Sequence, residues 1–418
     1  MRQLFICISL LIGSASQAYN LENVSLPKYP FINEKYADIQ VPGNDSTRLN
    51  SFFRKIDGLL QTGQGQINIL HIGGSHVQAG MFSNRVRRHL DALNDTLQTP
   101  RGLIFPFAVA KTNNPANYKV TYSGEWQSVR NVQKNREIPV GMCGIAVYTN
   151  DSSARIKVAL NPTDDNRWHF TRLRLMGSTL DGSNQVCPAL FYQQDTLPGY
   201  FDEISASYLF YPPEPQDTFC FGLLQLDTVP HAFIVNGFIP ENNTTDGIVY
   251  HAIGVNGASV PSYLQSEYFE DELPFICPDL VVFGIGINDA TASDFSRASF
   301  RRNYNELITR IKRVNPDCVF IFITNNDSYR RISRRNYRVN TNGQIAREVF
   351  YDLAKEHQGG VWDLYAWMGG LRSMYKWYTK GLGKQDRVHF TASGYQFIGD
   401  AFYNAFIDYI RQIESPTE

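Results

Sequence analysis

INILHIGGSHVQAG, at residues 67–80, opens with an apolar, β-branched run and breaks at two consecutive glycines. Apolar residues then recur at helical spacing over 77–93, so the stretch predicts a buried strand, a tight turn and a helix. Ser75 and His76 stand at the turn. In open α/β sheets, ligands bind at the carboxyl ends of strands, where helix N-termini offer free N–H groups. Ser75 therefore stands where a nucleophile is useful, although serine is also a common helix N-cap.

Strand and helix patterns alternate around this stretch and again from residue 247 onward. Helical spacing first appears over 48–61, directly before the strand. Further strands are expected within 248–259, 278–289, 316–327 and 361–365, and further helices over 260–269, 295–314, 342–356 and 391–410. Strands that alternate with helices imply right-handed crossovers and a parallel sheet covered on both faces. We therefore predict a three-layer α/β/α domain.

Residues 118–246 have a different texture, with short alternating runs separated by Gly, Asn, Asp and Pro. Such runs, for instance at 168–177 and 219–227, predict antiparallel strands in a β-sandwich or jelly roll. We expect this β-rich module to be inserted into the α/β domain. The expected organisation is a signal peptide at 1–18, an extended N-terminal extension at 19–48, the first part of the α/β domain at 49–117, the inserted module at 118–246 and the second part at 247–418.

Residues 1–18 have an early arginine, a short apolar core and small residues before a cleavage position, which is typical of a secretory signal. No later stretch is long and apolar enough to span a bilayer, so we expect an exported protein in the periplasm or outside the cell. The formal net charge of −1 gives no bias toward nucleic acid. Beyond Cys7 the chain has five cysteines, and we expect mainly buried free thiols, with one or two disulfides as the alternative.

Four turn segments, at 73–76, 254–258, 286–289 and 386–389, lie at or beside the carboxyl ends of the expected strands. Together they supply the groups for acyl transfer. Ser75 is the candidate nucleophile, His389 the base, and Asp386 the carboxylate that holds the useful imidazole tautomer. The N–H groups of Ser75 and Gly257 and the side-chain amide of Asn288 are candidate oxyanion donors.

These four segments resemble the conserved blocks of the SGNH (GDSL-like) hydrolases, whose letters stand for Ser, Gly, Asn and His. On this sequence the blocks fall on Ser75, Gly257, Asn288 and His389, with Asp386 completing the triad, and the resemblance covers 65–93 and 248–410. The family usually has aspartate before the nucleophile, and here that residue is Gly74. The resemblance implies a three-layer fold and a serine esterase that needs no cofactor or metal.

The order of strand, serine turn, β-rich insert and GVNGA loop is similar to bacterial peptidoglycan O-acetylesterases, in which a carbohydrate-binding-like module interrupts the SGNH domain. The stretch at 139–149 resembles the entry to that module. This resemblance implies an O-acetylated glycan substrate, with peptidoglycan as the first candidate. An O-acetyltransferase with the same acyl-enzyme and a non-catalytic glycan-binding protein are the alternatives.

A basic run at 330–338 follows one expected strand on the active-site side. Most such runs are solvated loops. The sharper hypothesis is that Arg334 and Arg335 border the cleft and attract an anionic glycan. No dinucleotide, P-loop or metal-ligand spacing is found, so we expect no cofactor.

Overall fold

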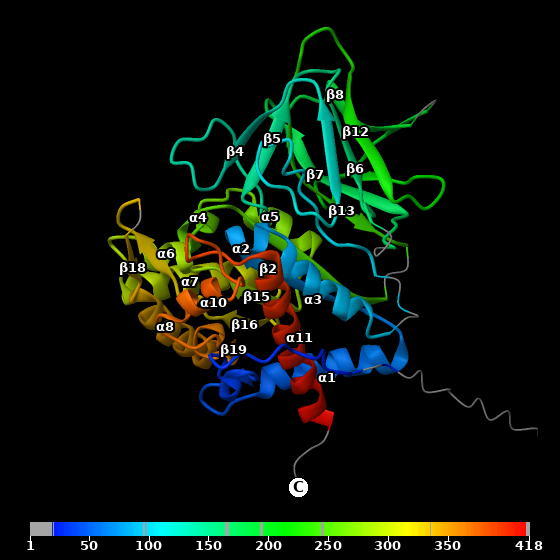
Figure 1. Cartoon of the computed structure of the whole chain (residues 1–418). Coiled ribbons are helices and arrows are strands. Elements are labelled where there is room, and N and C mark those ends of the chain that lie inside the picture. The colour runs from blue at the N-terminus through cyan, green and yellow to red at the C-terminus, as the bar shows by residue number, and fades with distance from the viewer. Residues whose placement is uncertain are drawn as a thin grey trace, which may run out of the picture.

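The computed structural model describes residue 19 and residues 21–414, apart from 95–96, 98, 164–166, 193–194, 244–245 and 335. The expected signal peptide at 1–18 and Arg335 therefore lie outside the described residues. Figure 1 shows a body of helices around a central sheet, with a β-rich module above it. Within the described residues, no helix is both long and apolar enough to cross a membrane.

The central sheet of the body, sheet A, has the strand order β1-β19-β16-β15-β2-β14. All neighbouring pairs are parallel except β1 with β19 at one edge. The five parallel strands come from both sides of the inserted module, as the sequence predicts. The strands are β1 (Ile39–Gln40), β2 (Gln66–Gly73), β14 (Gly247–Gly254), β15 (Leu280–Gly284), β16 (Val319–Ile323) and β19 (Gly360–Trp362).

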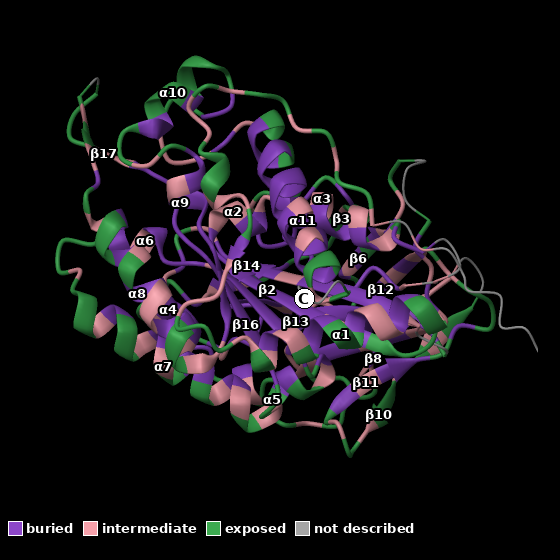
Figure 2. Cartoon of the chain, turned by 90° about the horizontal axis from the view of Figure 1, so that it is seen from below, coloured by how far each residue is buried: buried purple, intermediate pink, exposed green. Residues whose placement is uncertain are grey.

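Helices cover both faces of sheet A, because successive side chains of a strand point to opposite faces. In β15, Val281 and Phe283 pack into one hydrophobic cluster and Val282 packs into the other. The first cluster contains apolar residues of α7 (Arg297–Val314) and α8 (Asn342–His357), and the second contains those of α1 (Thr47–Thr62), α3 (Met81–Asp91) and α11 (Ala392–Glu414). Figure 2 shows the strands buried at the centre, with exposed helix faces around them.

The inserted module consists of two antiparallel sheets. Sheet B has the order β10-β11-β7-β13-β5-β4 and sheet C the order β3-β6-β12-β8-β9. They form a sandwich, since the ring of Phe238 in β13 lies 4.9 Å from Phe219 and 5.4 Å from Phe221 of β12. The strands are β3 (Lys119–Ser123), β4 (Gln127–Arg130), β5 (Ile145–Thr149), β6 (Arg155–Ala159), β7 (Arg172–Thr179), β8 (Val186–Phe191), β9 (Thr196–Pro198), β10 (Tyr200–Asp202), β11 (Ser207–Phe210), β12 (Thr218–Gln225) and β13 (Phe233–Glu241).

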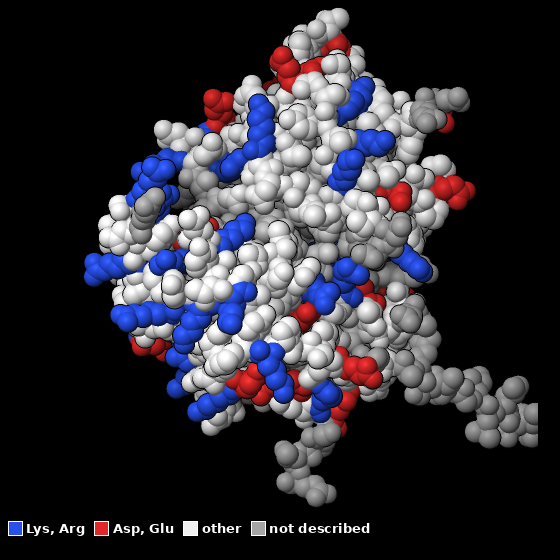
Figure 3. Space-filling model, in the orientation of Figure 1, with Lys and Arg blue, Asp and Glu red and all other residues white. Residues whose placement is uncertain are grey.

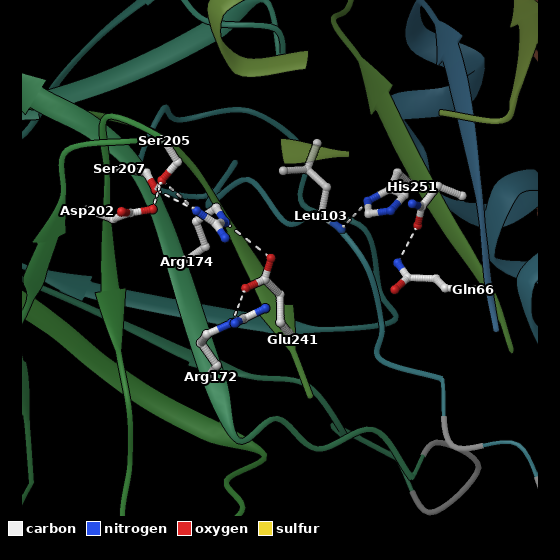
Figure 4. Close-up of polar contacts among 10 residues, drawn as sticks. Gln66, Leu103, Arg172, Arg174, Asp202, Ser205, Ser207, Glu241 and His251 are labelled. Carbon is white, nitrogen blue, oxygen red and sulfur yellow. Dashed lines mark hydrogen bonds and ion pairs between the residues drawn. The ribbon is translucent and has the colours of Figure 1, made fainter. Parts of the chain in front are cut away.

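Figure 4 shows polar contacts within sheet B and, beside them, polar contacts of β14 in the body. Glu241 accepts hydrogen bonds from Arg172 at 2.6 Å and from Arg174 at 3.1 Å. The Arg174 guanidinium also lies 5.3 Å from the ring centre of Phe275, in the short helix η2 (Leu273–Phe275) of the body. In the same view, the N–H of Leu103 donates to Nδ1 of His251 in β14 at 3.1 Å.

Glu272, at the end of α5 (Phe269–Glu272), places a buried carboxylate against the module. It accepts hydrogen bonds from the Met142 N–H at 2.7 Å and from the Asn236 amide at 2.6 Å. Burial raises the pKa of Glu272 from 4.5 to about 7. The folded protein therefore holds a proton that the unfolded chain has released, so the free energy of unfolding falls as pH rises from about 4.5 to about 7.

We expect Glu272→Gln to remove this pH-dependent fall in the free energy of unfolding, which is on the order of 3 kcal/mol. The glutamine keeps one acceptor oxygen, and Asn236 can turn its amide so that its unpartnered Oδ1 accepts from the new N–H₂ group. Urea denaturation at about pH 5 and about pH 8 measures the difference. Glu306→Gln, on the exposed face of α7, is the matched control. Equal pH dependence in the two variants would contradict the assignment.

Three neighbouring strands end in glycine at the same level of sheet A: Gly73 is in register with both Gly254 and Gly284. A Cβ on Gly254 would lie 2.5 Å from the N atom of Gln78 and 2.7 Å from the carbonyl oxygen of Gly74. Glycine is therefore needed where the serine turn passes over the end of β14.

We expect Gly254→Ala to lower the free energy of unfolding by about 1–3 kcal/mol, because the backbone of the turn has to shift. Gly58→Ala is the matched control, since a Cβ at Gly58 inside α1 has no neighbour within 4 Å. It is expected to stabilise the protein by about 0.5–1 kcal/mol through helix propensity. Thermal or urea unfolding distinguishes them, and equal effects would contradict the steric explanation.

Some expected elements are shorter in the structure. The helix expected over 77–93 is split into α2 (Ser75–Gln78) and α3, because Gly80 has a φ of +72° and a Cβ there would lie 2.5 Å from Cβ of Pro115. The helix expected over 260–269 is divided into α4 (Val260–Leu264) and α5. The strand expected over 361–365 ends at Trp362, because the Asp363 side chain caps α9 (Leu364–Trp367).

The described part of the expected N-terminal extension packs on the body. The N–H of Val24 donates to the side chain of Asn404 in α11 at 2.8 Å, and β1 joins the edge of sheet A.

The five cysteines among the described residues are free thiols. Cys143 and Cys318 are buried, whereas Cys277 is exposed, so the expected burial holds for only part of the set.

Candidate active site

Ser75 is the first residue of α2 and follows β2 directly after two glycines. Its Oγ lies 2.8 Å from Nε2 of His389, although 314 residues separate them in the chain. Nδ1 of His389 lies 2.8 Å from Oδ2 of Asp386. The structure thus brings together a hydroxyl, an imidazole and a carboxylate in the order that a Ser-His-Asp triad requires.

Asp386 is fixed by its own loop as well as by His389. Its Oδ1 accepts hydrogen bonds from the backbone N–H groups of Val388 and His389, both at 2.9 Å. Partial burial raises the pKa of Asp386, but the hydrogen bonds from the His389 side chain and from the two backbone N–H groups outweigh it, so its pKa lies well below the ordinary value. The carboxylate therefore stays ionised and can orient the imidazole across the working range of pH.

The three candidate oxyanion donors lie around the serine turn. Among the described residues, the backbone N–H groups of Ser75 and Gly257 donate to no acceptor. Gly257 is exposed, has a φ of +83°, and faces open space on its Cβ side. The Asn288 amide uses one hydrogen on the carbonyl of Ala258 at 2.8 Å, which leaves the other free to donate. The role of these groups stays a prediction.

Gly74 occupies the position where the resemblance places aspartate. Its φ is −103°, and a Cβ there would lie 3.4 Å from both the Ala258 carbonyl oxygen and the Asn288 amide nitrogen, which is ordinary contact. The position therefore has space for a Cβ. The turn is held from elsewhere: Tyr263 donates to the Gly73 carbonyl at 2.8 Å.

Two buried polar residues that the sequence did not single out connect the catalytic segments. Gln78 accepts a hydrogen bond from the Asn256 N–H at 2.7 Å and so links α2 to the loop after β14. Asp289 accepts from the Val260 N–H at 3.2 Å through both oxygens, and burial raises its pKa to about 6. Asp289 adjoins Asn288 in the sequence, but its partner is set only by the fold, so no sequence signal identifies this role.

His76 packs against His389 but is not a member of the triad. Its Nδ1 is 2.8 Å from the Tyr395 hydroxyl, and its ring centre is 5.2 Å from that of His389. Burial lowers the pKa of His76 to about 3, so the ring is neutral. It borders a cavity of about 40 Å³ that also reaches His71 and Asn325. His76 therefore supports the loop as a neutral ring.

The basic run forms a hairpin of β17 (Tyr329–Arg331) and β18 (Tyr337–Val339). Arg334 is exposed near its tip, and Arg335 lies outside the described residues. Arg330 instead donates to the Ala290 carbonyl at 3.0 Å, which anchors the hairpin to α6 (Ile287–Thr291), the helix that carries Asn288. The hairpin thus borders the site, while substrate binding by Arg334 and Arg335 stays a prediction.

The groups needed for acyl transfer are therefore side chains and backbone N–H groups of the chain itself. No cluster of three or more His, Cys, Asp or Glu side chains that could hold a metal occurs in the described part of the chain.

This architecture and site define the acylhydrolase class of α/β/α proteins. Residues 234–397 match the model of the GDSL-like lipase/acylhydrolase family, a range that contains Gly257, Asn288, Asp386 and His389. The second part of the α/β domain therefore matches the GDSL-like, or SGNH, hydrolases. Ser75 precedes the matched range because the inserted module divides the domain.

One solved structure shares the fold over most of the chain. A peptidoglycan O-acetylesterase is 20% identical, covers 89% of this chain and 99% of its own, and has a TM-score of 0.70. The match spans most of the chain, and it confirms the expected α/β/α fold with its inserted module. Two other structures match shorter parts of the chain. An acetyl xylan esterase is 22% identical, covers 38% of this chain and 82% of its own, and has a TM-score of 0.31. A lipase/acylhydrolase from Enterococcus faecalis is 25% identical, covers 39% of this chain and 77% of its own, and has a TM-score of 0.30. No curated protein matches the sequence.

Proposed function

We propose that this chain is an exported serine esterase that removes O-acetyl groups from carbohydrate, with peptidoglycan as the substrate. The observation that carries the proposal is the contact chain from Ser75 Oγ through His389 to Asp386, with both distances 2.8 Å. The fold shared with a peptidoglycan O-acetylesterase supports the choice of substrate. Export rests on the signal-like sequence at 1–18.

In the proposed reaction, Ser75 Oγ attacks the acetyl carbonyl carbon while His389 Nε2 takes the hydroxyl proton. The N–H groups of Ser75 and Gly257 and the Asn288 amide stabilise the negative oxygen of the tetrahedral intermediate. His389 then gives its proton to the departing sugar oxygen, which leaves acetyl-Ser75. Water, activated by His389, attacks the acyl-enzyme, and acetate and free Ser75 result.

Release of acetate from O-acetylated peptidoglycan, O-acetylated xylan and O-acetylated sialoglycan tests the substrate, with Ser75→Ala as the blank. We expect the fastest release of acetate from O-acetylated peptidoglycan. Faster release from another polymer would overturn the choice of substrate. If an added glycan acceptor receives the acetyl group in preference to water, the protein is an acetyltransferase on the same scaffold.

A further inference from the structure

Arg387 lies between Asp386 and His389 of the triad, one residue after the aspartate and two residues before the histidine. Its guanidinium is surrounded by aromatic rings. The distances from its central carbon to the ring centres are 4.7 Å for Tyr337, 5.2 Å for Tyr329, 5.0 Å for Tyr375 and 6.0 Å for Tyr378. Two rings come from the β17–β18 hairpin and two from α10 (Ser373–Thr379). We call these four residues the tyrosine cage.

The Arg387 guanidinium makes no hydrogen bond or ion pair with any residue that the structure describes, and its Nε is buried without a partner. This distinguishes it from Arg330, which bonds to the Ala290 carbonyl, and from Arg347, which pairs with Asp363. Ring faces attract a guanidinium without using its in-plane N–H groups. The cage therefore holds the charge in place without using the N–H donors.

Arg387 also lies among segments that are rich in positive charge. The segments that form the cage, residues 329–339 and 372–387, contain ten Lys and Arg residues and one acidic residue, Asp386. The Asp386 oxygens bond to His389 and to backbone N–H groups. The chain as a whole carries a formal net charge of −1, so the positive charge is concentrated beside the triad. Figure 3 shows Lys and Arg side chains gathered on the hairpin side of the hollow between body and module.

We propose that Arg387, held by the tyrosine cage, binds a carboxylate of the substrate next to the acetyl ester. This inference rests on the proposed esterase function and narrows its substrate to acetylated sugars that carry a negative charge. A guanidinium binds a carboxylate through two parallel N–H donors, and such charge-assisted hydrogen bonds are strong. Two of the rings, Tyr375 and Tyr378, are exposed and offer apolar faces beside the carboxylate site.

A matched pair of sugars tests the proposal: N-acetylmuramic acid and N-acetylglucosamine, each acetylated at O6, differ by one lactyl group with its carboxylate. The readout is the ratio of kcat/KM for the acidic sugar to that for the neutral one. We expect wild type to favour the acidic sugar by about tenfold or more. A third substrate, in which the carboxylate belongs to an alanine attached to the lactyl group, distinguishes a sugar carboxylate from a peptide carboxylate.

Arg387→Asn removes the charge, and asparagine tolerates the left-handed backbone at this position, where φ is +56°. In Arg387→Asn we expect the ratio of kcat/KM for the acidic sugar to that for the neutral sugar to fall about tenfold, toward one. Arg387→Lys should keep part of the preference for the acidic sugar, because lysine retains the positive charge but lacks the two parallel N–H donors of a guanidinium. Arg54→Asn, on the exposed surface of α1 at the bottom of Figure 1, changes the net charge equally and keeps the ratio. Because each ratio compares two substrates on one variant, partial misfolding cancels.

A wild-type ratio near one for every carboxylate-bearing substrate, or an unchanged ratio in Arg387→Asn, would overturn the inference and leave the esterase proposal standing. Hydrolysis of an aryl acetate without hydrolysis of any acetylated sugar would overturn the proposed function and this inference with it. A fall in kcat/KM for the acidic and neutral sugars alike in Arg387→Asn would show that Arg387 only positions the triad loop, which also rejects the carboxylate site.

Discussion

Ser75→Ala is expected to lower kcat/KM for an acetyl ester by a factor of roughly 10⁴ or more, because the acyl-enzyme can no longer form. The Oγ atom of Ser75 lies 2.8 Å from Nε2 of His389. Alanine keeps the backbone N–H of residue 75 and the start of α2, so binding and the fold should be retained. Initial rates with an aryl acetate and with an acetylated sugar measure the loss.

The matched control is Ser51→Ala, since Ser51 is an exposed serine inside α1 and away from the site. It should hydrolyse both substrates at the wild-type rate. A serine-directed phosphonate should label the wild type and the control but not Ser75→Ala. Full activity or full labelling of Ser75→Ala would reject the nucleophile assignment; the alternative of a helix cap is already contradicted, because Gly74 is the N-cap of α2 and no side chain caps that helix.

The ends of the strands around Ser75 could be predicted from the sequence, because each is marked by an apolar run followed directly by a glycine. The β-branched run before Gly73 predicts β2, and the runs before Gly254 and Gly284 predict β14 and β15. Parallel strands align their carboxyl ends, so the segments that follow them have to meet. The rule does not by itself place His389 against Ser75, because His389 lies in the loop before the closing helix and does not directly follow a strand.

Contacts set by tertiary packing could not be anticipated in this way. At the break between α2 and α3, Pro115 from a distant segment lies so close to Gly80 that a side chain there would clash. The tyrosine cage needs the hairpin and α10 to meet at Arg387, and no spacing in the sequence encodes that meeting. The hydrophobic pattern specifies which face of an element is buried, whereas side-chain partners depend on how the elements finally pack.

Asp386→Asn is the second variant with a large expected effect, a loss of roughly 10⁴ in kcat. The backbone N–H groups of Val388 and His389 both donate to Oδ1. The asparagine oxygen therefore has to stay at that position, and its N–H₂ group has to face Nδ1 of His389. Nδ1 then accepts a hydrogen bond, so the neutral ring carries its proton on Nε2, where it can no longer take the proton of Ser75.

A second variant, Asp386→Glu, distinguishes the effect of ring orientation from the effect of negative charge. Asp386→Glu keeps the negative charge but lengthens the side chain, so it cannot bond to both backbone N–H groups and Nδ1 with the present geometry. If charge alone mattered, Asp386→Glu would keep most of the activity. If the tautomer and the ring position matter, as the three hydrogen bonds of Asp386 indicate, both variants lose activity, and Asp386→Asn loses more because its ring is held in the inactive tautomer. Near wild-type activity in Asp386→Asn would remove Asp386 from the triad.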